Sequence, residues 1–340
     1  MKDDVGNTRD FSTVHTNTSS LLGGPQTLTI EDVASMAGAT IEEVRDFWVA
    51  MGFPSPQSEE KIFTENDAKL FLQWSTFMAS GAIDTATARS LLRANSHLAD
   101  RLGLWQVEAL VEDTMRRFGL DDTAARMYVL DHIRERVDVL EDVLRHSWRR
   151  QLDALLKRMD HEISTRGHEG LQPRFPLNRS LGFVDMVSYT SSSAILGGKL
   201  VDLIGRFEQL SRDAVTDAGG RVVKMIGDAV MYIADDLETG LRVAVSLIEQ
   251  LGADDQMLPV RASFVRGDVF SRSGDVFGPT VNLASRLVDI APVGKILMDP
   301  TTAAAIAAGK AGMEYDVEEF PSATLRGFGT ISPYLLTYRR

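Results

Sequence analysis

The sequence contains no cysteine among its 340 residues. This absence excludes a disulfide framework, a cysteine nucleophile and a thiolate metal site, and it fits a reducing compartment such as the cytoplasm. No run of about 18 apolar residues occurs, so we expect no membrane span. The N-terminal segment contains acidic side chains and no apolar core, unlike a secretory signal.

Charge and composition narrow the class of protein further. The formal net charge is −12, which makes the chain a poor partner for the backbone of a nucleic acid. Hydrophobic residues make up 44% of the chain and charged residues 25%, values that are ordinary for a globular protein. The length favours about two to three domains.

The pattern along the chain changes three times. Residues 1–26 are polar and lack periodicity, so we expect a disordered tail. Residues 27–168 show helical patterns and no convincing alternating strands, which predicts an all-α domain. Residues 169–180 combine glycine with proline and are expected to be a linker. Residues 181–340 alternate short β-type runs with helical stretches, which predicts an α+β domain.

The end of the helical half predicts one long helix over residues 121–163. Its apolar residues step by three or four along a single stripe. They are Leu130, Ile133, Val137, Leu140, Leu144, Trp148, Leu152, Leu155, Met159 and Ile163. Such a helix can pack within a bundle, form a dimer or carry a signal between domains, and these alternatives are compatible.

Four polar side chains stand out in the C-terminal half. Asp185 and Asp228 follow apolar runs where the chain turns, and the turn at Asp228 is predicted to be a tight hairpin. Carboxylates at such places can hold Mg²⁺, although aspartate is also common in turns for geometric reasons. Asn282 and Arg286 are four residues apart and share one helix face, either as a functional pair or as a solvated face.

The segments that contain these residues are FVDMVSYT, KMIGDAVM and GDVFGPTVNLASRL, and LRGFGTISPYLLTYR follows them. In order and spacing they resemble the catalytic domain of class III nucleotidyl cyclases. The resemblance implies a ferredoxin-like βαβ core with a mostly antiparallel sheet. It also implies an adenylate cyclase, which converts ATP to 3′,5′-cyclic AMP and pyrophosphate when the ribose 3′-oxygen attacks the α-phosphate.

The resemblance assigns a role to each matching position. Asp185, Asp228 and the backbone carbonyl of Met186 would bind two Mg²⁺ or Mn²⁺ ions. Lys224 and Asp275 would select the purine.

Three further positions complete the site that the resemblance implies. Asn282 would orient the ribose, Arg286 would stabilise the transition state, and Arg326 would bind the triphosphate. The family's two active sites form at a head-to-tail homodimer interface, with metal ligands from one protomer and the other groups from its partner.

The purine pair makes physical sense for adenine. Lys224 donates and Asp275 accepts, which complements the N1 acceptor and the 6-amino donor of adenine. Guanine reverses this pattern and would leave polar groups unpaired, at about 1–3 kcal/mol each. We therefore expect ATP to be favoured over GTP.

The segment TLTIEDVASMAGATIEEVRDFWVAMGFP resembles the helix-turn-helix start of MerR-type regulators. The alternative function is therefore a DNA-binding or nucleotide-sensing regulator. The expected reading helix carries Glu42, Glu43 and Asp46 against Arg45 alone, and those acids would face phosphates. We expect no nucleic-acid partner.

The whole architecture also resembles actinobacterial cyclases whose N-terminal helical domain restrains the catalytic half and responds to pH or lipid. All six histidines precede residue 170, and His132, His146 and His161 fall close to one face of the predicted long helix. We hypothesise that this helix moves or bends when these histidines gain a proton. The alternative is three solvated surface histidines.

Overall fold

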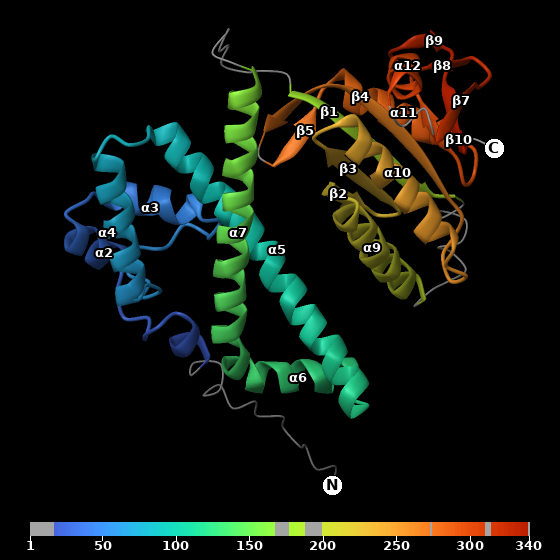
Figure 1. The fold of residues 1–340 in the computed structure, drawn as a ribbon. Helices are drawn as coiled ribbons and strands as arrows, with labels where there is room; N and C mark the ends of the chain where they lie inside the picture. The colour runs from blue at the N-terminus through green and yellow to red at the C-terminus, as the bar shows by residue number, and fades with distance from the viewer. Residues whose placement is uncertain (1–16, 167–176, 188–198, 273, 310–313, 339–340) are drawn as a thin grey trace. The chain divides into compact units, whose positions relative to one another are not determined.

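The structure is a computed structural model that describes residues 17–166, 177–187, 199–272, 274–309 and 314–338. The chain divides into two compact units at residue 167, and each is described by itself (Figure 1). Within the described ranges, no helix is both long enough and apolar enough to cross a membrane.

The N-terminal unit is helical, apart from an isolated β-bridge between Leu28 and Phe63. Its helices are α2 (Ile30–Ala37), α3 (Ile41–Ala50), α4 (Glu65–Ala79), α5 (Thr85–Phe118), α6 (Asp122–His132) and α7 (Arg134–Arg166). Threonines start α2, α3 and α4, and each forms a capping box with an acid three residues later. The core of this unit contains Ile30, Val33, Phe47, Phe63 and Phe71. The expected all-α domain is therefore present.

The expected tail is partly wrong. Residues 17–21 are helical, and Asn17 is buried with its amide donating to the carbonyl of Leu130 at 2.6 Å. Asn66 donates to the carbonyls of Leu22 and Gly23, which fixes the following turn. These long-range hydrogen bonds order a polar segment that has no periodicity of its own. Residues 1–16 lie outside the described residues.

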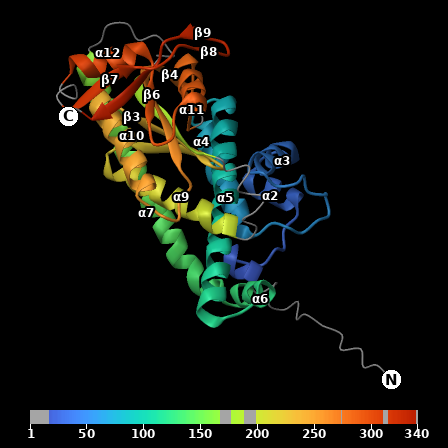
Figure 2. The same ribbon diagram turned by 90° about the vertical axis from the view of Figure 1, so that its right-hand side faces the viewer.

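The predicted single helix over residues 121–163 is wrong, because α6 and α7 are separate helices that meet at Ile133. Figures 1 and 2 show α6 running across the ends of α5 and α7. The cause is tertiary packing. Ala125 and Val129 of α6 are buried with Val111 of α5 in a small core of their own. Arg136 donates to the carbonyl of His132 at 3.1 Å and so satisfies the end of α6.

The C-terminal unit begins inside the predicted linker, because β1 starts at Leu177. Its strands are β1 (Leu177–Met186), β2 (Arg221–Ile226), β3 (Ala229–Ala234), β4 (Val260–Arg272), β5 (Asp275–Phe277), β6 (Ile296–Met298), β7 (Tyr315–Glu319), β8 (Ala323–Leu325), β9 (Gly329–Ile331) and β10 (Tyr334–Tyr338). Its helices are α9 (Lys199–Asp217), α10 (Leu237–Gly252), α11 (Pro279–Ile290) and α12 (Pro300–Ala308).

The main sheet has the order β2-β3-β1-β4-β6-β10-β7, with β5 paired to β4. Its first four strands alternate with α9 and α10 as two interleaved βαβ units, which is the ferredoxin-like arrangement. All pairs are antiparallel except β4 with β6. The expected α+β fold, with a mostly antiparallel sheet, is confirmed.

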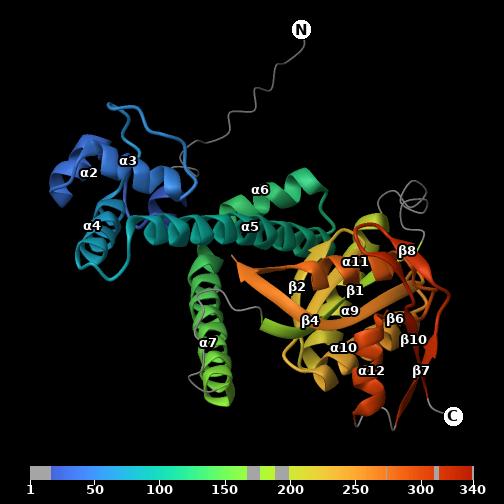
Figure 3. The ribbon, with the colours of Figure 1, turned by 90° about the horizontal axis from the view of Figure 1, so that it is seen from above.

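Helices cover both faces of this sheet (Figure 3). On one face α9 and α10 pack against Val184, Met186 and Phe264. On the other face α11 packs through Ala284 and Leu287. We call the second face the α11 face, because the candidate site lies there.

Candidate active site

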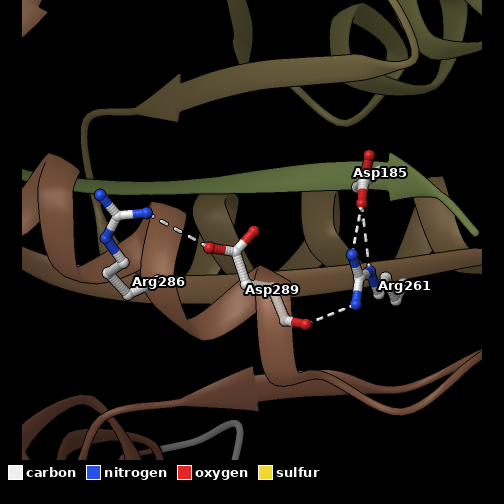
Figure 4. Close-up of polar contacts among 4 residues, drawn as sticks. All are labelled: Asp185, Arg261, Arg286 and Asp289. Carbon is white, nitrogen blue, oxygen red and sulfur yellow. Dashed lines mark hydrogen bonds and ion pairs between the residues drawn. The ribbon is translucent and has the colours of Figure 1, made fainter. Parts of the chain in front are cut away.

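The two-residue period of β1 directs Asp185 to the α11 face. Leu181 and Phe183 are buried on that face, whereas Val184 and Met186 are buried on the opposite face. Asp185 is half-buried at the end of the strand. It therefore carries its carboxylate out of the sheet beside the C-terminal end of α11 (Figure 4).

Asp228 lies in the predicted tight hairpin, which the structure confirms. Ile226 pairs with Ala229, and Gly227 between them has a φ of 60°, a conformation that favours glycine. The carbonyl of Asp228 accepts from the N–H of Met186 at 3.0 Å, which brings the hairpin to the end of β1. Burial raises the pKa of the Asp228 carboxyl, and the nearby charge of Asp185 raises it further, against the opposing charge of Arg261.

The donor set fits a hard divalent cation. Two carboxylates at one end of the sheet supply oxygen ligands, the kind that Mg²⁺ and Mn²⁺ prefer. The side chain of Met186 is 2% exposed within the core, so this residue has only its backbone to offer a metal. Among the described residues no cluster of three or more His, Cys, Asp or Glu could hold a metal. An ion here would therefore need oxygens from substrate or water as well.

A β-bulge in β2 places Lys224 on the α11 face. The register of β2 against β3 shifts between Val222 and Lys224, so that Lys224 pairs with Met231 rather than lying on the face of Val222. Its ammonium group reaches Asp275 of β5 at 2.6 Å. Two residues that are distant in sequence, and that were expected to select the purine together, are thus in contact.

The surroundings of Asp275 favour its ionised form. Burial opposes ionisation of Asp275, but hydrogen bonds from Lys224 and from the N–H of Val276 outweigh it and hold the pKa of the carboxyl below its usual value. The side chains are 37% and 31% exposed, so both remain accessible to a ligand.

Helix α11 presents Asn282 and Arg286 on its exposed face, as their spacing predicts. Gly278, with a φ of 136°, and Pro279 start the helix directly after β5. Arg286 lies 3.4 Å from the carboxylate of Asp289, one turn further along. The face of Asn282 and Arg286 is therefore solvated in this chain, and Arg286 forms an ion pair there, which does not exclude a functional role.

Arg326 lies elsewhere in the unit. It follows β8 in the exposed turn of the β8–β9 hairpin, which comes after β7 at the other end of the sheet from β2. The structure does not bring it to the Lys224–Asp275 pair by any contact among the described residues.

The three histidines occupy different settings. The ring of His132 is half-buried at the end of α6 and stacks on Tyr128, with ring centroids 4.0 Å apart. His146 is exposed on α7. The side chain of His161 lies outside the described residues. Because α6 and α7 are separate, the expectation that all three share one helix face is wrong.

Sequence reasoning missed Arg261 of β4. This residue pairs directly with Asp185 across the strands, and its guanidinium binds the Asp185 carboxylate at 2.8 Å. The signal in the sequence was an arginine within a strand, between the apolar Val260 and Ala262. Strand alternation directs such a side chain to the face opposite to theirs.

Comparison with known proteins places this arrangement in a family. Residues 178–338 match the model of the adenylate and guanylate cyclase catalytic domain. The chain is 37% identical over 326 residues to an adenylate cyclase of Glutamicibacter nicotianae, covering 93% of this chain and 80% of the relative. The chain belongs to the class III adenylate cyclases. An adenylate cyclase of Streptomyces coelicolor is 32% identical over 345 residues, covering 94% of this chain and 88% of that relative.

Two other cyclases match a smaller part of the chain. The pH-sensitive adenylate cyclase MT1302 of Mycobacterium tuberculosis is 34% identical over 120 residues, which is 35% of this chain and 30% of that relative. Among solved structures, the adenylyl cyclase CyaB of P. aeruginosa aligns with a TM-score of 0.43 at 19% identity, covering 50% of this chain and 98% of that one. The N-terminal helical unit lies within the two long alignments, so this class III cyclase shares it with its actinobacterial relatives.

Proposed function

We propose that this cyclase converts ATP to 3′,5′-cyclic AMP and pyrophosphate, as a homodimer with two active sites. The observation that carries the proposal is the Lys224–Asp275 pair, in which the ammonium group of a β2 residue lies 2.6 Å from the carboxylate of a β5 residue. An ammonium donor beside a carboxylate acceptor complements the N1 and 6-amino groups of adenine. The same pair opposes guanine, whose donor and acceptor are reversed.

The residues perform the reaction by positioning and by neutralising charge. The ribose 3′-oxygen forms a bond to the α-phosphorus while the bond to the pyrophosphate oxygen breaks, and the 3′-hydroxyl proton leaves to solvent. Asn282 holds the ribose so that the 3′-oxygen lies in line with the leaving group. Arg286 offers planar N–H donors to the charge that develops around the phosphorus. Arg326 adds positive charge for the triphosphate.

Asp185, Asp228 and the Met186 carbonyl would hold two Mg²⁺ or Mn²⁺ ions. When bound, such ions lower the pKa of the 3′-hydroxyl and neutralise the triphosphate. The contribution of the chain is to keep two carboxylates side by side at the end of β1 and the β2–β3 turn. The pKa of Asp228 is raised first by burial and then by the charge of Asp185, and a divalent cation would relieve that repulsion.

The exposed apolar side chains of α7 support the proposed homodimer. Trp148 is 60% exposed, and other members of the stripe are also exposed. These members are Leu144, Leu152, Leu155, Met159 and Ile163, and Val139, Val143 and Leu156 beside the stripe are exposed as well. A second copy of α7 along this stripe would remove them from water. Two-fold pairing would then give two sites, each with metal ligands from one protomer and Arg286 from the other.

Two signals are proposed to act on the helical unit. A proton is the first, because His132 lies at the junction of α6 and α7 and its carbonyl accepts from Arg136. A charge on the ring would stand beside that guanidinium and disfavour the present junction. A lipid is the second, because a cavity of about 420 Å³ is lined by Phe47, Phe71 and Trp74. Replacing His132, His146 and His161 together tests the proton signal, which fails if the pH profile of activity is unchanged.

Helices α2 and α3 form the segment that resembles a DNA-binding helix-turn-helix. Two of the acids of α3 have partners, since Glu43 caps the helix with Thr40 and Asp46 pairs with Arg89 at 3.0 Å. They would oppose phosphates, so we disfavour this function. A gel shift on genomic fragments tests it directly.

The first experiment is cyclic nucleotide production by the full chain with Mn²⁺, from ATP and from GTP, at several pH values. We expect cyclic AMP in excess over cyclic GMP. If neither nucleotide gives a product although ATP still binds, the enzyme proposal fails and the chain is instead a nucleotide sensor.

A further inference from the structure

A cavity of about 740 Å³ lies in the cyclase unit where the sheet opens between β6 and β10. Strand β10 pairs with β6 at two positions, the last of which is Leu335 with Leu297, and with β7 along its whole length. Ile296 and Leu336, which would form the next pair with β6, line the cavity instead. Sites for small molecules occupy about 300–1,000 Å³, so the opening is large enough for a ligand.

The middle of the cavity is apolar. Val245 and Ile248 of α10 line it together with Ile296 and Leu336 of the two separated strands. All four belong to, or pack against, the core between α10 and the sheet. A ligand with a chain of methylene groups would cover these side chains and displace water from them.

Carboxylates lie on both sides of this apolar middle. Glu249 lines the cavity from α10 and is therefore on the face of the sheet that α10 covers. Tyr315 of β7 packs into the core on that same face, so strand alternation places Asp316 and Glu318 on the opposite, α11 face. Thr337 of the neighbouring strand donates to the carboxylate of Glu318 there at 3.3 Å. The cavity thus has acidic groups at two separate ends.

One lysine also lines the cavity. Lys295 precedes Ile296, whose side chain is in the core on the α10 face, so alternation places Lys295 on the α11 face with Asp316 and Glu318. Its ammonium group offsets one of the two carboxylates on that face. Among the described lining residues, one net negative charge therefore remains at each end of the cavity.

The state of Tyr315 agrees with a negative field at the α10 end. Burial raises the pKa of its phenol, and the charges of Glu314 and Glu249 raise it further. A partly buried place with excess negative charge favours a cationic ligand, because the attraction is screened less there than in water.

We propose that this cavity binds a linear organic dication, a diamine of the polyamine class with one ammonium group at each end. The methylene chain lies on Ile248, Ile296 and Leu336. One ammonium group binds Glu249, and the other binds the carboxylates on the α11 face. A compact cation such as Mg²⁺ would reach one end and leave the apolar middle unfilled. No residue of the proposed active site takes part, so the inference is independent of the cyclase reaction.

The test is isothermal titration of the full-length protein with 1,4-diaminobutane, in buffer without nucleotide or divalent metal. The ionic strength is physiological, which screens weak attraction to the acidic surface of the protein. Two further probes separate the contributions of charge and chain. One is 1-aminobutane, which has the same chain with one ammonium group, and the other is 1,4-butanediol, which has no charge. Hydrogen exchange with and without the diamine locates the site.

Three variants test the parts of the cavity. Glu249→Gln and Asp316→Asn each remove one charge at one end, and Ile248→Trp fills the apolar middle while leaving every charge in place. Glu238→Gln is the matched control, because Glu238 is an exposed acid of the same helix that is not among the lining residues. Thermal melts without the diamine confirm that each variant is folded.

We expect the diamine to bind the wild-type protein, 1-aminobutane to bind about tenfold more weakly or less, and 1,4-butanediol not to bind. The dissociation constant of the diamine should rise about tenfold or more in Glu249→Gln and in Asp316→Asn. Binding should be lost in Ile248→Trp and unchanged in Glu238→Gln. Exchange should slow at residues 294–296 and 336–337 when the diamine is present.

Three results would overturn the proposal. The first is a wild-type protein that binds no diamine. The second is binding that survives in Ile248→Trp or weakens equally in Glu238→Gln, because the diamine would then be attracted to the acidic surface and not held in the cavity. The third is 1-aminobutane or Mg²⁺ binding as tightly as the diamine at the same place, which would show that the two ends do not act together.

Discussion

Helices α10 and α7 show how differently the two units use apolar side chains. Helix α10 buries seven residues against the sheet, among them Leu241, Val243 and Leu247. Helix α7 is about twice as long, yet none of its described side chains is buried. Both sequences contain regular apolar spacing, but only one of the helices has a surface to cover within its own unit.

The difference shows what periodicity alone means. A regular apolar stripe predicts a helix and the face that seeks burial, but not the partner that supplies it. For α10 the partner is the sheet of the same unit. For α7 we propose a second copy of the chain. The comparison therefore separates the cyclase unit from the helix that, in our proposal, pairs with a second copy of the chain.

The largest expected effect comes from the catalytic unit. Asp228→Ala and Arg286→Ala should each lower cyclic AMP production by about 100- to 1,000-fold, because in the proposed function Asp228 binds a metal ion and Arg286 donates to the transition state. Activity assays of each variant at saturating Mn²⁺ check this. Neither change should alter the oligomeric state.

Mixing the two variants sharpens the comparison. If each site takes Asp228 from one protomer and Arg286 from the other, a heterodimer contains one intact site, and an equal mixture recovers about a quarter of wild-type activity. No recovery after subunit exchange would show that each chain carries its own complete site.

The second effect concerns the exposed apolar stripe of α7. Trp148→Glu places a charge in the exposed apolar stripe of α7 and should weaken the dimer by about 2 kcal/mol or more, roughly 30-fold in Kd. Sedimentation of the full chain over a range of concentrations measures it, and activity should fall in parallel at low concentration. Gln151→Glu is the control on an exposed polar position of the same helix. An unchanged Kd for Trp148→Glu would remove α7 from the dimer interface.

The sequence predicted the fold of the catalytic unit well, because its strands and helices cover one another locally. The hairpin at Asp228 followed from its turn residues, and the Asn282–Arg286 face followed from helical spacing. Motif resemblance supplied the pairing of Lys224 with Asp275. Their contact depends on a bulge in β2, and no residue pattern in that strand predicted this bulge.

The sequence predicted the helical unit less well. A stripe that continues across Ile133 gave no sign of the break between α6 and α7, since the break results from packing of α6 on α5. Residues 17–26 are held in place by hydrogen bonds to Leu130 and Asn66, which lie far along the chain. Arg261 was missed for a similar reason, because its partners come from two other elements. Long-range contacts are what a single sequence leaves open.

The third effect concerns nucleotide choice. Asp275→Asn keeps the size of the side chain but gives it a donor as well as an acceptor, and it removes the charge that pairs with Lys224. We expect kcat/KM for ATP to fall about tenfold or more, equivalent to about 1–3 kcal/mol, while that for GTP changes less. Measuring both constants checks whether the ATP to GTP ratio narrows. An unchanged ratio would mean that the purine is selected elsewhere.

The smallest effect is a gain of stability at the cost of function. The pKa of Asp228 is raised in the folded protein, mainly by burial and then by Asp185, so its ionised form is disfavoured there. A raised folded pKa means that the carboxyl favours folding at low pH and that this contribution is lost as pH rises through the folded pKa. Asp228→Asn stays neutral at every pH, so it avoids the cost of burying a charged carboxylate. In metal-free buffer at pH 7 it should raise Tm by about 2–4 °C, as a change of about 1 kcal/mol does in a domain of this size.

The pH dependence of that gain is the decisive part. Below the ordinary pKa of aspartate the wild-type carboxyl is protonated in both the folded and the unfolded state, so the two proteins should melt together, and the difference should appear as pH rises. Scanning fluorimetry across this range measures it. A gain that persists at low pH would come from turn geometry rather than charge. With Mn²⁺ and 3′-deoxy-ATP present the order should reverse, because only the wild-type protein gains stability from the cation that its two carboxylates are placed to hold.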